Sequence, residues 1–390
     1  VDKVRINPGN YRLDRGELEV LVARCRERGV ALRIGVNHGS LSKRIFDEWG
    51  DTPEGMVAAA MEFLHVCRRE AFDQVVVSMK SSNTRVMVAA YRLLVEAMER
   101  EGMTYPIHLG VTEAGNGLEG RIKSAVGIGA LLADGIGDTI RVSLTEAPEN
   151  EIPVARLLAD HFRERPGTFE VKHPERYSPT VYRRRSSVQT PVVRDEITPA
   201  FRLLESTSQN PTAELRAAIL SLDGDEPAAV VRRYDDTDLT TLAVKAAADL
   251  GPLFLDGLAD GIRILDDRFT ETQLRDVELM ILQAARVRFS HTEYIACPSC
   301  GRTLYDIEGT LAQIKARTSH LKNLKIGVMG CIVNGPGEMA DADYGYVGAA
   351  PGRITLYKGR TVVERNIPQE EALDRLIALI RENGDWQEPE

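Results

Sequence analysis

The sequence predicts an α/β chain in three parts: a partial (β/α)8 TIM barrel over residues 1–163, a connector with a truncated, degenerate barrel-like insert over 164–290, and a compact α+β domain over 291–390. Three observations predict this organisation. Short β-rich runs alternate with helical stretches five times in the first part, which is typical of parallel strands joined by helical crossovers. A stretch of that part recurs 122 residues later. The last hundred residues change to short strands around three cysteines.

The β-rich runs of the first part are VDKVRIN (1–7), ALRIGVN (31–37), QVVVSMK (74–80), PIHLGVT (106–112) and DTIRVSL (138–144). Between them lie helical patterns such as 17–28, where apolar residues recur at helical spacing before Gly29, a helix stop. Five strands do not close a barrel of eight, so we expect the other three upstream of Val1, and we interpret the chain as part of a longer protein.

Each of these strands ends in polar residues that share one face. They are Arg5 and Asn7, Arg33 and Asn37, Ser78 and Lys80, His108 followed by Glu113, and Arg141 and Ser143. Parallel strands bring their carboxyl ends to one edge of the sheet, where barrel enzymes build their sites. Four of the residues are cations, and guanidinium groups pair bidentately with phosphate. The sequence therefore predicts a site for a diphosphate-like ligand.

The composition limits the choice of partners. The formal net charge of −9 argues against nucleic acid or an anionic membrane as the main partner. No apolar run approaches the roughly 20 residues of a spanning helix, so we expect a soluble protein. Five cysteines in 390 residues are too few for a disulfide framework and indicate a reducing compartment.

The middle part combines a connector and a repeat. Residues 164–212 are rich in Pro, Arg and Ser and read as an extended connector, in which the run 183–185 is more readily a solvated loop than a ligand site. The stretch GALLADGIGDTIRV (129–142) realigns with GPLFLDGLADGIRI (251–264), which suggests a duplicated unit. Leu265 replaces the polar Ser143, so we expect the second copy to be non-catalytic.

The last part begins with a CxxC turn. A helix is expected at 304–318, strands at 325–330, 344–348, 353–359 and 361–366, and a closing helix at 370–383. Cys297 and Cys300 form the CxxC turn, and Cys331 opens a glycine-rich loop. Cys25 and Cys67 lie on apolar helix faces and read as core thiols.

Three thiols leave a four-coordinate metal incomplete. Zinc requires a fourth Cys or His, and His291 and His320 do not form a zinc-like pair. An iron–sulfur cluster can take three thiolates and leave one iron to an oxygen ligand. Glu338, seven residues after Cys331, is a candidate for that oxygen, with a helix start or a surface acid as the alternative. Such an exchangeable ligand would leave one iron open to substrate.

Six motifs together resemble the 4-hydroxy-3-methylbut-2-enyl diphosphate synthase family in its three-domain form. They are RINPGN (5–10), RIGVNHGSL (33–41), HLGVTEAG (108–115), DGIGDTIRVSL (134–144), CPSCGRT (297–303) and GCIVNGPGE (330–338). The resemblance implies an iron–sulfur oxidoreductase of the methylerythritol phosphate route to isoprenoids. It implies reductive ring opening and dehydration of 2-C-methyl-D-erythritol 2,4-cyclodiphosphate to (E)-4-hydroxy-3-methylbut-2-enyl diphosphate, with two electrons from ferredoxin or flavodoxin.

The resemblance also assigns residues. The ligands of a [4Fe–4S] cluster would be Cys297, Cys300, Cys331 and Glu338. The substrate-binding set would be Arg5, Asn7, Arg33, Asn37, Lys80, Arg141 and Ser143, with Asn334 as a cluster-side contact. Glu113 would act as an acid at the substrate hydroxyls. The family closes its cluster domain over the barrel mouth, and the insert would serve as the spacer that allows this within one chain.

Two departures from the family leave open whether this stretch turns over by itself: three barrel strands are missing, and the insert is too short for a whole second barrel. The expected location is the bacterial cytoplasm, or the plastid for a plant or algal source. The oligomeric state is left open, with a homodimer among the options. Two other readings are a zinc-stabilised phosphate-binding barrel enzyme without redox chemistry and a cluster-bearing regulator. The cation ring argues against the regulator.

Overall fold

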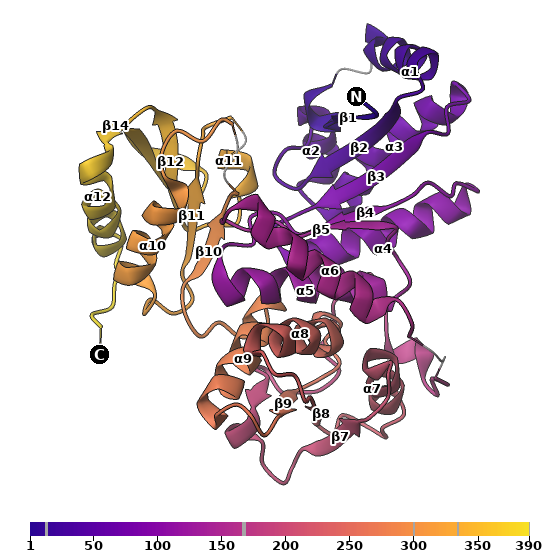
Figure 1. The fold of residues 1–390 in the computed structure, drawn as a ribbon, viewed down its shortest axis with the longest axis vertical. Coiled ribbons are helices and arrows are strands. Elements are labelled where there is room, and N and C mark those ends of the chain that lie inside the picture. The colour runs from indigo at the N-terminus through magenta and orange to yellow at the C-terminus, as the bar shows by residue number, and fades with distance from the viewer. Residues whose placement is uncertain (12–14, 166–168, 299–300, 334, 390) are drawn as a thin grey trace.

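The fold consists of three lobes, with the barrel strands, the insert and the C-terminal domain each forming one (Figure 1). We describe residues 1–11, 15–165, 169–298, 301–333 and 335–389 in a computed structural model of the chain. Within these ranges, no helix is both long and apolar enough to cross a membrane.

The five expected barrel strands form a parallel arc. Their bounds are β1 Lys3–Ile6, β2 Ala31–Asn37, β3 Val75–Lys80, β4 His108–Gly110 and β5 Thr139–Arg141. β1, β2 and β3 pair in sequence order, β4 pairs with β5, and a parallel bridge from Val77 to Ile107 links the two groups. The arc does not close among the described residues, so the partial (β/α)8 barrel predicted from the sequence is confirmed.

The helices between these strands cover the outside of the arc. Their bounds are α1 Glu17–Arg28, α2 Lys43–Trp49, α3 Pro53–Arg69, α4 Thr84–Arg100, α5 Gly117–Ala133 and α6 Glu151–Phe162. Helix α1 ends at Gly29, whose φ of 61° is the left-handed conformation that glycine adopts without steric cost. Asn83 begins α4 by accepting hydrogen bonds from the backbone of Arg85 and Val86.

The insert is an open sheet of four parallel strands in the order β6-β9-β8-β7. Its elements are β6 Val192–Val193, β7 Arg202–Ser206, α7 Pro211–Leu220, β8 Ala228–Arg233, α8 Leu239–Leu255, β9 Gly261–Leu265 and α9 Glu271–Ala284. Strands β6 and β7 lie within the stretch expected as an extended connector. They gave no sequence signal because β6 has two residues and only the last residue of β7 is buried.

The internal repeat corresponds to two equivalent helices that pack on each other. Helices α5 and α8 have the same length at the predicted offset, and both are followed by a strand. A Cβ atom at Gly129 would lie 2.7 Å from the Cα of Ala248, and one at Gly251 would lie 2.7 Å from a methyl carbon of Val126. Val126 and Ala248 are themselves equivalent in the repeat, so the two helices cross about a pseudo-two-fold axis.

The residues that end α5 and α8, Asp134 and Asp256, are also equivalent in the repeat, and both form buried ion pairs. Arg92 contacts Asp134 and Asp256, each over 2.7 Å. Arg216 contacts the same two carboxylates over 3.0 and 2.9 Å. Because all four side chains are largely buried, each charge depends on its partners for compensation. The duplicated aspartates therefore join the insert to the barrel.

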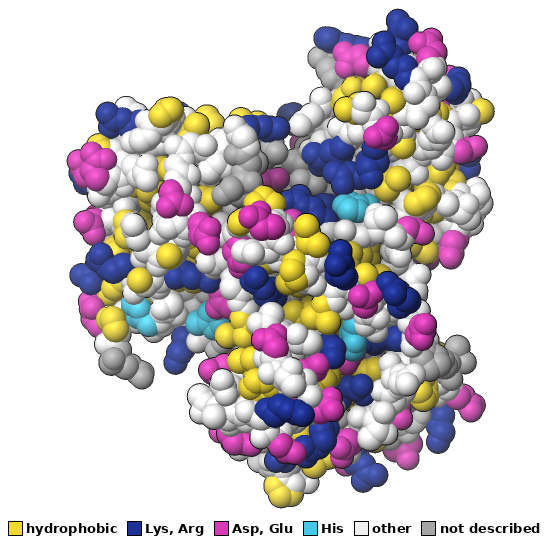
Figure 2. Space-filling model, viewed as in Figure 1, with side chains coloured by type: hydrophobic (Ala, Val, Ile, Leu, Met, Phe, Trp, Pro, Cys, Tyr) yellow, Lys and Arg dark blue, Asp and Glu magenta, His cyan; other side chains and the backbone are white. Residues whose placement is uncertain are grey.

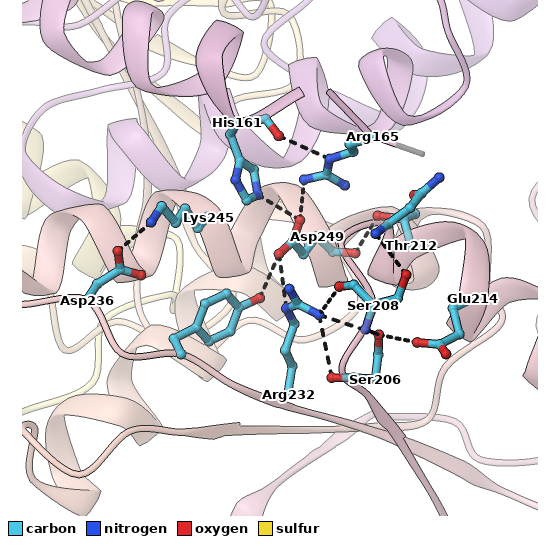
Figure 3. Close-up of polar contacts among 12 residues, drawn as sticks. His161, Arg165, Ser206, Ser208, Thr212, Glu214, Arg232, Asp236, Lys245 and Asp249 are labelled. Carbon is cyan, nitrogen blue, oxygen red and sulfur yellow. Dashed lines mark hydrogen bonds and ion pairs between the residues drawn. The ribbon is translucent and has the colours of Figure 1, made fainter. Parts of the chain in front are cut away.

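Asp249 is a second buried anchor between these two lobes. His161 and Arg165, in and just after α6, contact one carboxylate oxygen over 2.8 and 2.5 Å. Tyr234 donates a hydrogen bond to the other oxygen over 3.0 Å, and Arg232 lies 3.4 Å from it. Figure 3 shows His161, Arg165 and Arg232 converging on Asp249 from both lobes.

The C-terminal domain is a five-stranded mixed sheet in the order β10-β11-β12-β13-β14, of which the first three strands are parallel. Its elements are β10 Glu293–Ala296, α10 Ile307–Thr318, β11 Lys325–Met329, α11 Gly335–Glu338, β12 Tyr344–Ala350, β13 Arg353–Lys358, β14 Thr361–Pro368 and α12 Gln369–Glu382. The expected helix begins at Ile307 because the Asp306 side chain caps it by accepting from the backbone of Gly309. The expected later strands and closing helix are confirmed to within a few residues.

Candidate active site between the barrel and the C-terminal domain

A cavity of about 460 Å³ lies between the carboxyl ends of the barrel strands and the C-terminal domain. The barrel contributes Arg5, Arg33, Asn37, Ser78, Lys80, Thr112, Glu113, Arg141 and Ser143. The C-terminal domain contributes Cys297, Pro298, Gly301, Arg302, Cys331, Gly335 and Glu338. Figure 2 shows Lys and Arg side chains gathered beside the hollow between these two lobes.

The strand register brings the cations together. Arg5 is the register partner of Arg33, and Asn37 is the partner of Lys80. Register partners in neighbouring strands point to the same face of the sheet. Arg141 ends β5 next to the strand that precedes Glu113. Four cations from four strands therefore face one cavity, as the sequence predicts.

This concentration of positive charge perturbs Lys80, which is 6% exposed. Burial, together with the charges of Arg141, Arg33 and Arg5, lowers the pKa of the Lys80 ammonium to about 7. His108 hydrogen-bonds Thr139 through Nδ1 over 2.8 Å. Burial and the Lys80 charge lower the pKa of His108 to about 3, so this imidazole is neutral at pH 7.

The guanidinium groups are incompletely satisfied by the protein. Nε of Arg33 is buried and has no hydrogen-bond partner among the described residues. Arg5 donates to the carbonyl oxygen of Gly35 over 2.8 Å and to the side-chain oxygen of Asn37 over 3.2 Å. An unpaired buried donor is costly, and an anion in the cavity would satisfy it.

Two carboxyl groups meet across the cavity, one from each lobe. Glu113 has a left-handed backbone with φ of 49°, a strained conformation that places its side chain in the cavity wall. Burial and the neighbouring Glu338 raise the pKa of Glu113 well above its ordinary value. Burial also raises the pKa of Glu338, although hydrogen bonds and the charge of Arg5 favour its ionised form.

The loop after β2 contacts the segment before Glu338 closely. A Cβ atom at Gly39 would lie 1.9 Å from the carbonyl oxygen of Gly337, and one at Gly337 would lie 2.5 Å from the carbonyl oxygen of Gly39. Asn37 donates to a carboxylate oxygen of Glu338 over 3.3 Å. Only glycine permits this approach of two backbones, which brings Glu338 into the barrel mouth.

The cysteine side of the cavity suits a metal cluster. Cys297 and Cys331 line the cavity together with Glu338, and the backbone NH of Gly330 donates to Sγ of Cys297 over 3.2 Å. Backbone donors to sulfur are typical of iron–sulfur sites. No group of three metal-binding side chains is preassembled within the described ranges. The predicted ligand Cys300 lies outside those ranges.

Among the described residues, the predicted site residue Asn7 is not part of the cavity wall. Asn7 donates to Ser40 over 3.0 Å and accepts from the backbone of Gly9 over 3.1 Å, so its side chain supports the turn after β1. Asn334, like Cys300, lies outside the described residues.

Thr112 and Arg302 line the cavity but were not named from the sequence. The position of Arg302 two residues after the CxxC turn was the one available signal for it.

Comparison with known proteins agrees with this geometry. Residues 1–156 match the family model described as the GcpE TIM-barrel domain, and residues 293–382 match that of the GcpE protein C-terminal domain. A Porphyromonas gingivalis protein named 4-hydroxy-3-methylbut-2-en-1-yl diphosphate synthase (flavodoxin) is 47% identical over all of this chain and 82% of its own length. A Parabacteroides distasonis protein of the same name is 45% identical over 99% of this chain and 83% of its length.

The middle of the chain differs in length from these relatives. The alignment with the Porphyromonas protein spans 475 positions, whereas this chain has 390 residues. The relative therefore has residues within the matched stretch that this chain lacks. Both ends of the chain nevertheless match the family, and the expectation of an enzyme is confirmed. The chain belongs to the GcpE family, whose matched members are named 4-hydroxy-3-methylbut-2-en-1-yl diphosphate synthase (flavodoxin).

Proposed function

We propose that this protein reduces 2-C-methyl-D-erythritol 2,4-cyclodiphosphate to (E)-4-hydroxy-3-methylbut-2-enyl diphosphate in the bacterial cytoplasm, using a [4Fe–4S] cluster and two electrons from flavodoxin or ferredoxin. The observation that carries the proposal is the single cavity lined by four barrel cations and by the cysteines of the C-terminal domain. The names of the relatives support flavodoxin as the donor.

The overall reaction defines what the side chains must do. The bond between C2 and its phosphate oxygen breaks, the C3 hydroxyl leaves as water, and a double bond forms between these carbons. Two electrons and one proton enter, and the freed phosphate oxygen gains a negative charge. The protein must therefore stabilise added charge on the diphosphate and deliver a proton to the departing hydroxyl.

Arg5, Arg33, Lys80 and Arg141 are suited to the diphosphate. They approach the cavity from separate strands, so they can hold both phosphate groups in one orientation. Their attraction for the ligand increases as the ring opens because the product carries more negative charge. Ser143 and Asn37 line the same wall and can orient the remaining oxygens.

Glu113 is suited to donate the proton. Its raised pKa favours the protonated carboxyl, and its place in the wall that the barrel cations and Glu338 also line puts it near the hydroxyls of a ligand held by the cations. A deprotonated carboxylate there would also add repulsion against the diphosphate.

Cys297, Cys300, Cys331 and Glu338 would hold the cluster. When bound, the cluster supplies single electrons and Lewis acidity. Asn37 donates to the Glu338 carboxylate from the barrel side, so Glu338 would hold the cluster next to the substrate-binding wall.

Anaerobic reconstitution with iron and sulfide tests the proposal. We expect about four irons per chain, broad absorption near 400 nm, and formation of the allylic diphosphate with reduced methyl viologen. Stoichiometric zinc in a colourless protein would instead favour the zinc-stabilised phosphate-binding enzyme.

A further inference from the structure

Arg286 has a strained backbone at the point where the chain leaves the insert. It follows α9 and precedes β10, and its φ of 59° lies in the left-handed region that residues with a side chain rarely adopt. Glycine would adopt this conformation without the steric cost. A strained backbone persists only where the surrounding contacts hold it in place, and in Arg286 both the backbone turn and the side chain make such contacts.

The turn around Arg286 is tied to the barrel through its backbone. The carbonyl oxygen of Ala284 accepts a hydrogen bond from the Thr84 hydroxyl over 2.6 Å, and that of Ala285 accepts from Nε of Arg85 over 3.1 Å. Thr84 and Arg85 begin α4, the helix that follows the strand ending in Lys80. The exit from the insert is therefore fixed relative to the strand ends of the cavity.

The guanidinium of Arg286 reaches the C-terminal domain. Nη1 lies 3.2 Å from both carboxylate oxygens of Glu293, and Nη2 lies 3.9 Å from the carboxylate of Asp341. Although burial opposes ionisation, cations that include Arg286 hold the pKa values of both acids below their ordinary range. Both carboxylates are therefore charged and depend on this side chain.

The same two acids also contact the barrel. Lys123 of α5 lies 3.0 Å from Glu293, and both side chains are less than one tenth exposed. Asn83, in the loop after β3, donates to Asp341 over 3.0 Å. The charge of Lys325 also favours the ionised form of both acids. Removing Arg286 would leave Glu293 paired with Lys123 and Asp341 hydrogen-bonded to Asn83, each with less compensation for a largely buried charge.

The two acids are close in sequence to the candidate cluster ligands. Glu293 begins β10, which leads directly to Cys297, and Asp341 lies three residues after Glu338. Contacts that hold Glu293 and Asp341 in place therefore also hold the segments that carry Cys297 and Glu338 to the cavity.

We propose that Arg286 is a positioning residue, which holds the C-terminal domain at the barrel mouth so that the cluster ligands and the barrel cations face one cavity. This inference rests on the proposed function and deepens it. It gives the exit of the insert a role beyond that of a spacer, because a turn bound to the barrel supplies a cation to two acids of the C-terminal domain.

The test compares three variants of the full chain. Arg286→Gly removes the guanidinium and relieves the left-handed backbone, which limits the risk that the variant fails to fold. Arg286→Lys keeps one positive charge. Arg288→Gln is the matched control, because Arg288 lies two residues away and its guanidinium binds Glu196, inside the insert, over 2.9 Å.

Small-angle X-ray scattering reports the position of the C-terminal domain, and steady-state kinetics with reduced methyl viologen report its effect on the reaction. For Arg286→Gly we expect a larger radius of gyration and a fall in kcat on the order of tenfold or more, with KM nearly unchanged because the barrel cations bind the substrate. Arg286→Lys should recover most of both values, and Arg288→Gln should alter neither.

An Arg286→Gly protein with the scattering curve and the kcat of the unsubstituted chain would overturn the proposal, even if its melting temperature fell. If the unsubstituted protein takes up zinc in place of an iron–sulfur cluster and does not bind the cyclodiphosphate, the proposed function fails. The scattering comparison still decides whether Arg286 holds the domains together.

Discussion

Asn37, at the end of barrel strand β2, donates a hydrogen bond to Glu338 of the C-terminal domain over 3.3 Å, across 301 positions of sequence. This contact places the carboxylate predicted as the oxygen ligand of the cluster against a residue predicted to bind substrate. The barrel side and the cluster side of the site are therefore in direct contact within one chain.

Replacing Glu338 by alanine should make the cluster labile while the fold survives. The three cysteines would still hold the cluster, but the remaining iron would lose its protein ligand and exchange with solvent. Loss of absorbance near 400 nm under air should be several-fold faster than in the unsubstituted protein. Glu308→Ala, on the exposed face of α10, is the control. Equal rates in all three proteins would show that the carboxylate is not a ligand.

The internal repeat supplies a control residue for testing the role of Arg141 in anion binding. Arg141 lines the cavity, whereas its repeat counterpart Arg263 is exposed on β9 of the insert. Arg141→Met should weaken inorganic diphosphate binding by about 10- to 100-fold, the value of one charge-assisted contact. Arg263→Met should bind as the unsubstituted protein does. Titration calorimetry measures both, and equal losses would exclude a specific role for Arg141.

Lys80 should couple ligand binding to proton uptake. Its pKa of about 7 means that it is mostly neutral at pH 8 in the free protein. A bound diphosphate raises that pKa by favouring the charged form, so binding at pH 8 should take up on the order of one proton, and this uptake should vanish below about pH 6. Lys80→Arg stays charged throughout. Calorimetry in buffers of different ionisation enthalpy should find correspondingly less uptake in the variant, and identical uptake would contradict the assignment.

Asp249 should be a major contributor to stability. Its carboxylate is fully buried and faces Arg165 and Arg232, so Asp249→Asn would leave these buried arginines without compensation. We expect a loss of about 3–5 kcal/mol in the free energy of unfolding, measured with urea. Asp236→Asn breaks a more exposed pair with Lys245 and should cost less than about 1 kcal/mol. Similar losses in the two variants would contradict the account of this interface.

The sequence was most informative where local pattern and topology agree. Strand-end residues such as Arg33 and Lys80 could be assigned to one edge because parallel strands leave little freedom in register. The repeat was visible because Gly129 and Gly251 pack against equivalent helix positions. In contrast, strand β7 lies at a sheet edge with little burial, and β10 is only four residues long. Neither produced a periodic signal.

Contacts between lobes could not be predicted. Nothing in the local sequence places Arg286 against Glu293 and Asp341, since that contact depends on how three separately folded parts meet. Asn7 illustrates the opposite case, because a polar residue at a strand end can serve its own turn. Its hydrogen bonds to Ser40 and Gly9 have that role here.

The most direct test of the central claim is electron paramagnetic resonance of the reduced, cluster-loaded protein with and without the cyclodiphosphate. Because the barrel cations and the cluster ligands line one cavity, bound substrate should change the spectrum of the reduced cluster, and Arg33→Met should abolish the change at the same substrate concentration. A spectrum that stays the same while calorimetry shows the substrate bound would contradict the claim that both parts form one site.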